Sequence, residues 1–243
     1  MNKIAIIIPS RLDAQRLPNK PLKLINNKEM ILHVYEAAIS SKAGDVYIAT
    51  PDQEIIDTVQ KAKGNAIKTS SQHETGTDRI FEVFKNTLNY QPNIIINLQG
   101  DMPNIKPQAI SDLVSYMKLG KCDIGTLASE FSSNEEINNP NVVKVAVKNK
   151  LSDNIYLNAV DFFRTYDNCK DNLYHHIGIY AFTNKALMRY VNLKRTKLEL
   201  NRKLEQLRAL ENNMSIHVGY TKDSPLSVDT EEDFFEVKKI MEN

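Results

Sequence analysis

The feature that most constrains the fold is an apolar run at residues 4–8, Ile-Ala-Ile-Ile-Ile, which leads directly into a polar loop. An uninterrupted apolar run is typical of a central parallel strand that is covered on both faces. Pro9 ends this strand, and open α/β sheets bind their ligands at the carboxyl ends of such strands. The start of the sequence therefore predicts an α/β protein with a ligand site just after residue 9.

The loop that follows carries three cations, Arg11, Arg16 and Lys20, together with two prolines that stiffen it. Guanidinium and ammonium groups are suited to donating hydrogen bonds to phosphate oxygens. The net charge of the chain is only +1, so any affinity for anions must be local. An ordinary solvated loop is the plain alternative; the first hypothesis is that this loop binds a triphosphate.

Composition narrows the class of protein. Of the 243 residues, 42% are hydrophobic and 25% charged, which fits a single folded domain without a disordered bias. Nucleic acid is not expected as a partner, because the net charge supplies no broad positive field. Neither a secretory leader nor a membrane span is expected, so a cytoplasmic location is favoured. Cys122 and Cys169 fall in no metal-binding spacing and are interpreted as structural thiols, so no zinc site is expected.

Helical and strand patterns alternate through about residue 120. Apolar residues at helical spacing separate the strand at residues 4–8 from strands expected at 46–49 and 94–98. Such alternation predicts a doubly wound, mainly parallel sheet. Further strands expected at 142–147 and 177–182 would extend this sheet, within one domain covering residues 1–243.

The rest of the second half gives weaker signals. Residues 132–141 are Asn-rich and polar, which predicts a surface loop that joins the halves. Thr230–Asp233 fits a capping box that opens a terminal helix. Two apolar stripes at helical spacing are expected to face the core: Leu200, Leu204 and Leu207, and Phe234, Val237 and Met241.

Two acidic residues are candidate metal ligands. Asp101 follows the strand at 94–98 and should lie at the same sheet edge as the basic loop. Mg²⁺ is usually held by one or two carboxylates together with phosphate oxygens. Asp229 is the second candidate, although a carboxylate near a helix N-terminus is favoured by the helix dipole alone. If the fold brings Asp229 near Asp101, the two can hold Mg²⁺ against a triphosphate.

The segment His73–Arg79, with sequence HETGTDR, precedes a helix pattern. Its hydroxyls, glycine and backbone N–H groups can bind phosphate or other polar ligand atoms, and Arg79 adds a guanidinium. His175 and His176 are more readily explained as hydrogen-bonding residues than as metal ligands. The chain contains no GxGxxG, GxxxxGK[ST] or GxSxG motif, which removes the main support for nicotinamide binding, P-loop chemistry or a serine hydrolase.

Six segments in order, PSRLDAQRLPNKPL, HETGTDR, NLQGDMP, HIGIYAF, LEQLR and SVDTEED, resemble the 3-deoxy-manno-octulosonate (Kdo) cytidylyltransferases over nearly the whole chain. The resemblance implies an α/β nucleotidyltransferase, usually a homodimer. It implies the conversion of CTP and Kdo to CMP-Kdo and pyrophosphate with Mg²⁺, a step towards lipopolysaccharide. On this view residues 1 to about 120 bind CTP, and residues from about 121 to 243 bind the sugar and form the dimer.

The resemblance also implies roles for individual residues, carried over where the motifs match. Catalysis is assigned to Lys20, Asp101 and Asp229, with Asp101 and Asp229 as the Mg²⁺ ligands. Nucleotide binding is assigned to Ser10, Arg11, Arg16, Lys20, His73, Thr75, Gly76 and Thr77. Sugar binding is assigned to Arg79, Gln99, His176, Tyr180, Glu205 and Gln206.

The chain departs from the family pattern at several positions. Met102 and Asp78 each stand where Glu is usual, His175 stands where Arg is common, and Arg202 stands where an acidic residue is common. Residues 156–164 lack the usual Ser-Arg and Ile-Pro features. These departures leave open a different acidic sugar, such as 8-amino-Kdo or sialic acid. They also leave open a catalytically silent CTP-binding subunit.

Overall fold

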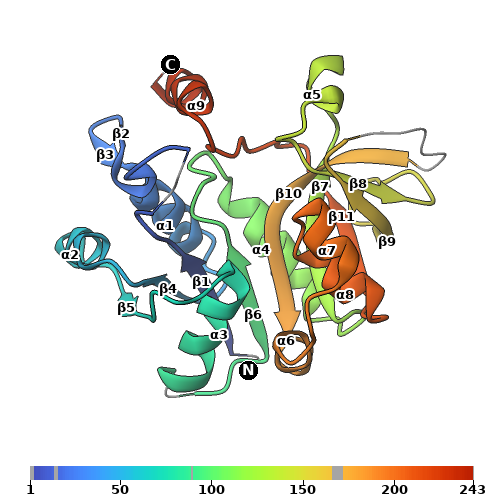
Figure 1. Cartoon of the computed structure of the whole chain (residues 1–243), viewed down its shortest axis with the longest axis horizontal. Helices are drawn as coiled ribbons and strands as arrows, with labels where there is room; N and C mark the ends of the chain where they lie inside the picture. The colour runs from blue at the N-terminus through green and yellow to red at the C-terminus, as the bar shows by residue number, and fades with distance from the viewer. Residues whose placement is uncertain (1–2, 14–15, 89, 166–171, 243) are drawn as a thin grey trace. The chain divides into compact units, whose positions relative to one another are not determined.

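The structure, a computed structural model, describes residues 3–13, 16–88, 90–165 and 172–242 (Figure 1). It divides into two compact units, Met1–Ser111 with Pro225–Asn243, and Asp112–Ser224. The boundary falls within helix α4 (Pro107–Met117). Residues 225–243 thus pack with the first unit, whereas the sequence grouped them with the second half. Cys169 lies outside the described residues.

The first unit is built on the parallel sheet that the alternating pattern predicts. The apolar run forms β1 (Ile4–Pro9), which is buried along its whole length between parallel neighbours β4 and β6. The strand order is β5-β4-β1-β6, so β1 is central. The strands and helices of this unit are β1, η1 (Lys20–Leu22), β2 (Leu24–Ile25), β3 (Lys28–Glu29), α1 (Met30–Ser40), β4 (Asp45–Thr50), α2 (Gln53–Lys61), β5 (Ala66–Lys68), α3 (Gly76–Asn86), β6 (Ile94–Leu98) and α9 (Glu231–Glu242).

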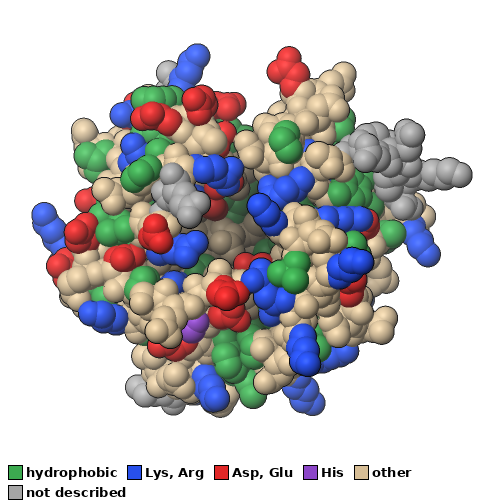
Figure 2. Space-filling view, viewed as in Figure 1, with side chains coloured by type: hydrophobic (Ala, Val, Ile, Leu, Met, Phe, Trp, Pro, Cys, Tyr) green, Lys and Arg blue, Asp and Glu red, His purple; other side chains and the backbone are tan. Residues whose placement is uncertain are grey.

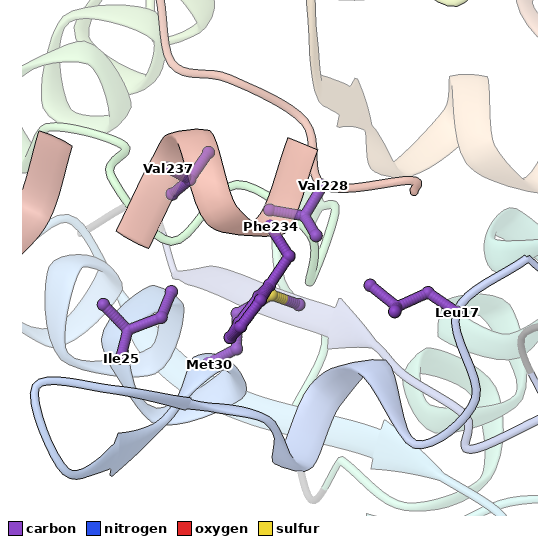
Figure 3. Close-up of a cluster of buried hydrophobic side chains, with 6 residues drawn as sticks. All are labelled: Leu17, Ile25, Met30, Val228, Phe234 and Val237. Carbon is purple, nitrogen blue, oxygen red and sulfur yellow. The ribbon is translucent and has the colours of Figure 1, made fainter. Parts of the chain in front are cut away.

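Helix α9 is fastened to the first unit by a cluster of buried apolar side chains (Figure 3). Burying side chains of this size stabilises a fold by about 1.5–3 kcal/mol each. The cluster holds the segment just before α9 beside the loop that follows β1. Its members are Leu17, Ile25 and Met30 from the N-terminal part of the chain, and Val228, Phe234 and Val237 from the C-terminal part.

The predicted capping box of α9 is present. The Thr230 hydroxyl accepts a hydrogen bond from the Asp233 N–H at 3.2 Å, and the Asp233 carboxylate accepts one from the Thr230 N–H at 2.8 Å. Asp233 Oδ2 also accepts from the Asp229 N–H at 2.9 Å. Of the predicted inward stripe, Phe234 and Val237 are buried, and Met241 is partly buried against the same cluster.

The second unit is a mixed sheet with the strand order β10-β7-β11-β9-β8. Strand β10 pairs with β7 through one part of its length and with β8 through another, so the strands close on themselves. The pair β7–β11 is parallel and the others are antiparallel. The elements are β7 (Ile124–Ser129), α5 (Asn134–Asn138), β8 (Lys144–Val147), β9 (Tyr156–Phe163), β10 (Asn172–Thr183), α6 (Asn184–Val191), α7 (Lys197–Arg202), α8 (Gln206–Glu211) and β11 (Ile216–Tyr220).

Two expectations for this unit are wrong in detail. Residues 132–141 are not only a loop, because they contain α5 with the buried carboxylate of Glu136. The stripe of Leu200, Leu204 and Leu207 does not lie on one helix, because Lys203 adopts a left-handed backbone conformation with φ 54° that ends α7 before α8 begins. Leu204 and Leu207 are buried as expected, whereas Leu200 is half exposed.

Charged residues of both signs are interspersed over the face shown in Figure 2, in keeping with the net charge near zero. Among the described residues, none of the helices is both long and apolar enough to cross a bilayer.

Candidate functional site

The carboxyl end of β1 is crowded by backbone from two other segments. A Cβ atom on Gly76, at the start of α3, would lie 3.2 Å from a side-chain carbon of Pro9. One on Gly100, after β6, would lie 3.2 Å from the Pro9 carbonyl oxygen. Ser10 follows directly, and its buried hydroxyl oxygen has no hydrogen-bond partner among the described residues. An orphaned hydroxyl at this sheet edge is suited to a polar ligand atom.

Beside this edge, Lys20, Asp101 and Asp229 form a group that we call the acid–lysine cluster. The Lys20 ammonium lies 3.3 Å from Asp101 Oδ2 and 3.5 Å from Asp229 Oδ1, and donates to the Val228 carbonyl at 2.7 Å. Arg16 Nη2 lies 3.1 Å from Asp229 Oδ2. The fold therefore brings Asp229 to Asp101, as the sequence analysis required for a shared metal.

The chemistry of this cluster fits a divalent cation. Burial raises the pKa of Asp101, the Lys20 charge opposes that rise, and the Asp229 charge adds to it. Two neighbouring carboxylates of this kind favour additional positive charge. Among the described residues, no group of three or more His, Cys, Asp or Glu is arranged to hold a metal. A pair of carboxylates is nevertheless enough for Mg²⁺ when phosphate oxygens complete its coordination.

The side chains of the HETGTDR segment are engaged with the protein. Thr75 caps α3, accepting from the Asp78 N–H at 3.1 Å and donating to Asp78 Oδ2 at 2.7 Å. Thr77 is buried and accepts from Asn97 of β6 at 3.2 Å. His73 is paired with Glu82. These contacts orient the start of α3 beside β1, so its backbone N–H groups are the better candidates for ligand contact.

Arg79 is almost wholly buried. Only 3% of the residue is exposed, and its Nη1 donates to the Thr69 hydroxyl at 2.6 Å and to the Ser70 carbonyl at 2.9 Å. Burial, and then the nearby charge of Arg11, lower the pKa of Arg79. Arg79 thus lies in the first unit with the candidate nucleotide-binding residues. Gln99 is also in this unit, where it donates to Asn97 at 3.1 Å.

Four of the candidate sugar-binding residues lie in the second unit. His176 and Tyr180 come from β10, with ring centroids 5.4 Å apart, and flank a register shift in its pairing with β7. Bulges of this kind re-aim side chains and recur beside active sites. The Thr126 hydroxyl hydrogen-bonds His176 Nε2 at 2.9 Å and donates to the Ile179 carbonyl at 2.7 Å.

The other two, Glu205 and Gln206, lie at the start of α8. Gln206 is buried, and its Nε2 has no hydrogen-bond partner among the described residues. Burial and then the Glu205 charge raise the pKa of Tyr180. Burial lowers the pKa of His176 to about 3, so its imidazole is neutral at pH 7. We call His176, Tyr180, Glu205 and Gln206 the second-unit cluster; its ring and amide groups can hydrogen-bond a neutral or polyhydroxylated ligand.

The residues that depart from the family pattern find partners in the structure. Arg202 Nη1 lies 2.7 Å and 2.8 Å from the two oxygens of Asp161 and donates to the Phe162 carbonyl at 2.9 Å. His175 Nδ1 lies 2.7 Å from Glu136 Oε1. Sequence reasoning missed Asp161 and Glu136, because a side-chain contact between residues so far apart in the chain leaves no local pattern.

Comparisons with known proteins identify the family of this chain. The sequence model of a family described as cytidylyltransferase matches residues 5–216. The 3-deoxy-manno-octulosonate cytidylyltransferase of Brucella ovis is 44% identical over 233 residues, 95% of this chain and 92% of its own length. The corresponding protein of Bartonella bacilliformis is 41% identical over 243 residues, 98% of each chain.

A solved structure gives the same result. CMP:2-keto-3-deoxy-manno-octonic acid synthetase complexed with CTP matches 99% of this chain and 98% of its own, with a TM-score of 0.88 and 34% identity. The α/β nucleotidyltransferase fold and the resemblance drawn from the six motifs are therefore confirmed. Because relatives above 40% identity match nearly its whole length, the chain belongs to the 3-deoxy-manno-octulosonate cytidylyltransferase family.

Proposed function

We propose that this protein transfers the cytidylyl group of CTP to 3-deoxy-manno-octulosonate, forming CMP-Kdo and pyrophosphate, with Mg²⁺ as cofactor. Family membership supports the reaction. The observation that carries the proposal is the acid–lysine cluster, in which two carboxylates and an ammonium from distant parts of the chain meet beside the end of β1. Such a set is suited to a nucleoside triphosphate that carries a divalent cation.

The first unit supplies the groups that would bind the triphosphate. Arg11, Arg16 and Lys20 provide positive charge, and the buried Ser10 hydroxyl provides an unused hydrogen-bonding group. The anomeric hydroxyl of the sugar attacks the α-phosphorus of CTP in line, a new P–O bond forms, the bond to pyrophosphate breaks, and the hydroxyl proton is released to solvent. Negative charge on the phosphoryl oxygens is stabilised by Arg11 and Lys20.

Asp101 and Asp229 would hold Mg²⁺, which when bound supplies positive charge for the phosphate oxygens. In the arrangement observed, the Lys20 ammonium is within 3.5 Å of both carboxylates. A divalent cation held by these carboxylates would be repelled by the ammonium, so Lys20 would exchange carboxylate oxygens for phosphate oxygens. Phosphate groups of the nucleotide would draw Lys20 away from the carboxylates, and binding of the nucleotide would therefore favour binding of the metal.

The second-unit cluster would recognise the sugar through hydrogen bonds from His176, Tyr180 and Gln206. A catalytically silent CTP-binding subunit is disfavoured, since the chain keeps both candidate metal carboxylates and the cations of the loop after β1. The homodimer is implied by the family resemblance, and the cytoplasmic location is the expectation drawn from the sequence; both stay predictions.

Release of pyrophosphate from CTP and Mg²⁺ tests the proposal, with Kdo, 8-amino-Kdo and sialic acid compared side by side. We expect the highest kcat/KM with Kdo, and loss of turnover when Mg²⁺ is chelated and recovery when it is restored. A higher kcat/KM with another acidic sugar would change the assigned sugar substrate but leave cytidylyl transfer as the reaction. CTP binding without turnover of any of the three sugars would favour the silent subunit.

A further inference from the structure

The corner between α7 and α8, which carries Glu205 and Gln206, is anchored by a buried ion pair. Glu199 is 1% exposed and Arg208 3% exposed. Arg208 donates from Nε to Glu199 Oε2 at 2.9 Å and from Nη2 to Glu199 Oε1 at 2.5 Å. Burying two charges costs much of what their attraction returns, so such a pair is weak evidence for stability alone. The two parallel hydrogen bonds between Arg208 and Glu199 instead fix the position of α8 relative to α7.

The ion pair is connected to the start of α8 through Tyr190. The guanidinium carbon of Arg208 lies 4.6 Å from the centroid of the Tyr190 ring, within cation–π range. The Tyr190 hydroxyl donates to the Glu205 carbonyl at 2.9 Å, and only 2% of Tyr190 is exposed. The Leu204 N–H donates to the Glu199 carbonyl at 3.2 Å across the corner. The Glu205 backbone is thus held by the Tyr190 hydroxyl at its own carbonyl and by the hydrogen bond that the preceding residue, Leu204, makes to Glu199.

The corner presents a polar group that the protein itself leaves unused. Gln206 is 6% exposed, and its Nε2 has no hydrogen-bond partner among the described residues. A buried donor without a partner costs about 1–3 kcal/mol, which a hydrogen-bonding ligand would recover. Recognition through one buried amide requires that its position be fixed to a fraction of an ångström. Glu205 and Gln206 are adjacent, so fixing the Glu205 backbone fixes the base of the Gln206 side chain.

We propose that Glu199, Arg208 and Tyr190 are positioning residues of the sugar-binding site. They act by holding the Glu205–Gln206 corner where the Gln206 amide can hydrogen-bond a hydroxyl of the polyhydroxylated acidic substrate. The inference rests on the proposed function and adds to it three residues that need not touch the substrate.

Tyr190→Phe tests the inference, because it removes the hydrogen bond from the Tyr190 hydroxyl to the Glu205 carbonyl and keeps the ring beside the Arg208 guanidinium. We expect the KM for the acidic sugar to rise about 5–10-fold, the effect of one hydrogen bond, with the KM for CTP unchanged within about twofold. Tyr174→Phe is the matched control: it also deletes a buried tyrosine hydroxyl that meets a backbone group, the Leu151 N–H at 2.9 Å. The control should keep the KM for the sugar.

Arg208→Lys keeps the charge but not the two-pronged contact, and should give the same selective rise in the sugar KM. If Arg208→Lys fails to fold, its KM values cannot report on the position of the corner. Tyr190→Phe, the smaller change, then decides the outcome. Equal rises in both KM values, or a lower Tm with both KM values unchanged, would show a purely structural role and overturn the inference.

A second measurement separates failure of this inference from failure of the proposed function. The rise in Tm on adding the acidic sugar is compared between wild type and Tyr190→Phe, and we expect a smaller rise in the variant. If the wild type shows neither turnover nor a sugar-dependent rise in Tm, the proposed function fails and takes the inference with it. If the wild type shows both and the variant matches it, only the inference fails.

Discussion

The acid–lysine cluster and the second-unit cluster place polar groups in opposite environments. In the first, 15% of the Lys20 side chain, 24% of Asp101 and 28% of Asp229 are exposed, and the partners are ions. In the second, His176 and Gln206 are almost wholly buried. Partly hydrated ions can change partners at modest cost, whereas buried groups cannot. Under the proposed function, this difference suits the first cluster to an exchange of charged partners and the second to holding its polar groups in fixed positions.

Removing a carboxylate from the acid–lysine cluster should have the largest effect. We expect Asp101→Ala to lower turnover by at least about 10³-fold, because one of two proposed metal ligands is lost. The fold should survive, since burial disfavours the charged form of Asp101 and raises its pKa. Pyrophosphate release and thermal unfolding measure the two effects. Asp153→Ala, at an exposed carboxylate, is the control; normal turnover by folded Asp101→Ala would refute the metal role.

Loosening the packing of α9 should disturb the acid–lysine cluster, although no residue of that cluster is changed. Phe234→Ala removes a ring from the buried group shown in Figure 3 and should lower the free energy of unfolding by about 3–5 kcal/mol. Turnover should fall as well, because Asp229 precedes this helix. The adjacent Phe235 is 59% exposed, so Phe235→Ala should change stability by less than about 0.5 kcal/mol. Denaturant titration of both variants measures the contrast, and equal losses would contradict it.

If Lys20 exchanges carboxylate oxygens for phosphate oxygens, replacing it should slow turnover but strengthen metal binding in the absence of nucleotide. Lys20→Met should slow turnover by roughly 10²–10³-fold, because a cation that stabilises phosphate charge is lost. Without nucleotide, the same variant should bind Mn²⁺ more tightly than wild type, because no ammonium competes for Asp101 and Asp229. Electron paramagnetic resonance measures unbound Mn²⁺, and Lys28→Met is a control at an exposed ion pair. Weaker Mn²⁺ binding by Lys20→Met would rule out the exchange.

The buried pair of Glu136 and His175 should give the smallest of the four effects, and one that depends on pH. Burial alone would raise the pKa of Glu136, but the hydrogen bond from His175 and those from Ser132 lower it to about 2, from an ordinary value of 4.5. A carboxylate with a lowered pKa stabilises the fold fully above its unfolded pKa, and that stabilisation is lost as pH falls from 4.5 towards 2.

Glu136→Gln should therefore cost about 3 kcal/mol in the free energy of unfolding at pH 6, and progressively less below pH 4.5. Chemical denaturation at pH 6 and pH 3 measures the difference, with the exposed neighbour Glu135→Gln as control. A cost that does not change between the two pH values would indicate that the loss arises from packing and not from the charge of the Glu136 carboxylate.

Much of the first unit could be predicted, because its signals are local. The apolar run that becomes β1 and the capping box of α9 are both patterns over a few consecutive residues. The second unit was harder, since β9 is half-buried and does not show a continuous apolar run. The break between α7 and α8 depends on one left-handed residue, Lys203, which no spacing rule detects.

Predictability of the candidate site also depended on whether the signal was local. The sequence proposed Asp101 and Asp229 but could state their meeting only as a condition. It assigned Arg79 to the sugar from the family resemblance, and that assignment stays a prediction; the hydrogen bonds of its guanidinium to Thr69 and Ser70 could be seen only in the fold.

By itself, the sequence determined the alternation of strands and helices, the basic loop after β1 and the family, because periodicity and motif order are properties of neighbouring residues. Only the tertiary structure decided that the C-terminal segment returns to the first unit and brings Asp229 to Lys20 and Asp101. The same is true of the buried pair of Glu199 and Arg208. The physical reason is that contacts between distant residues are selected by burial of apolar side chains such as Phe234, a choice made by the whole fold and by no segment alone.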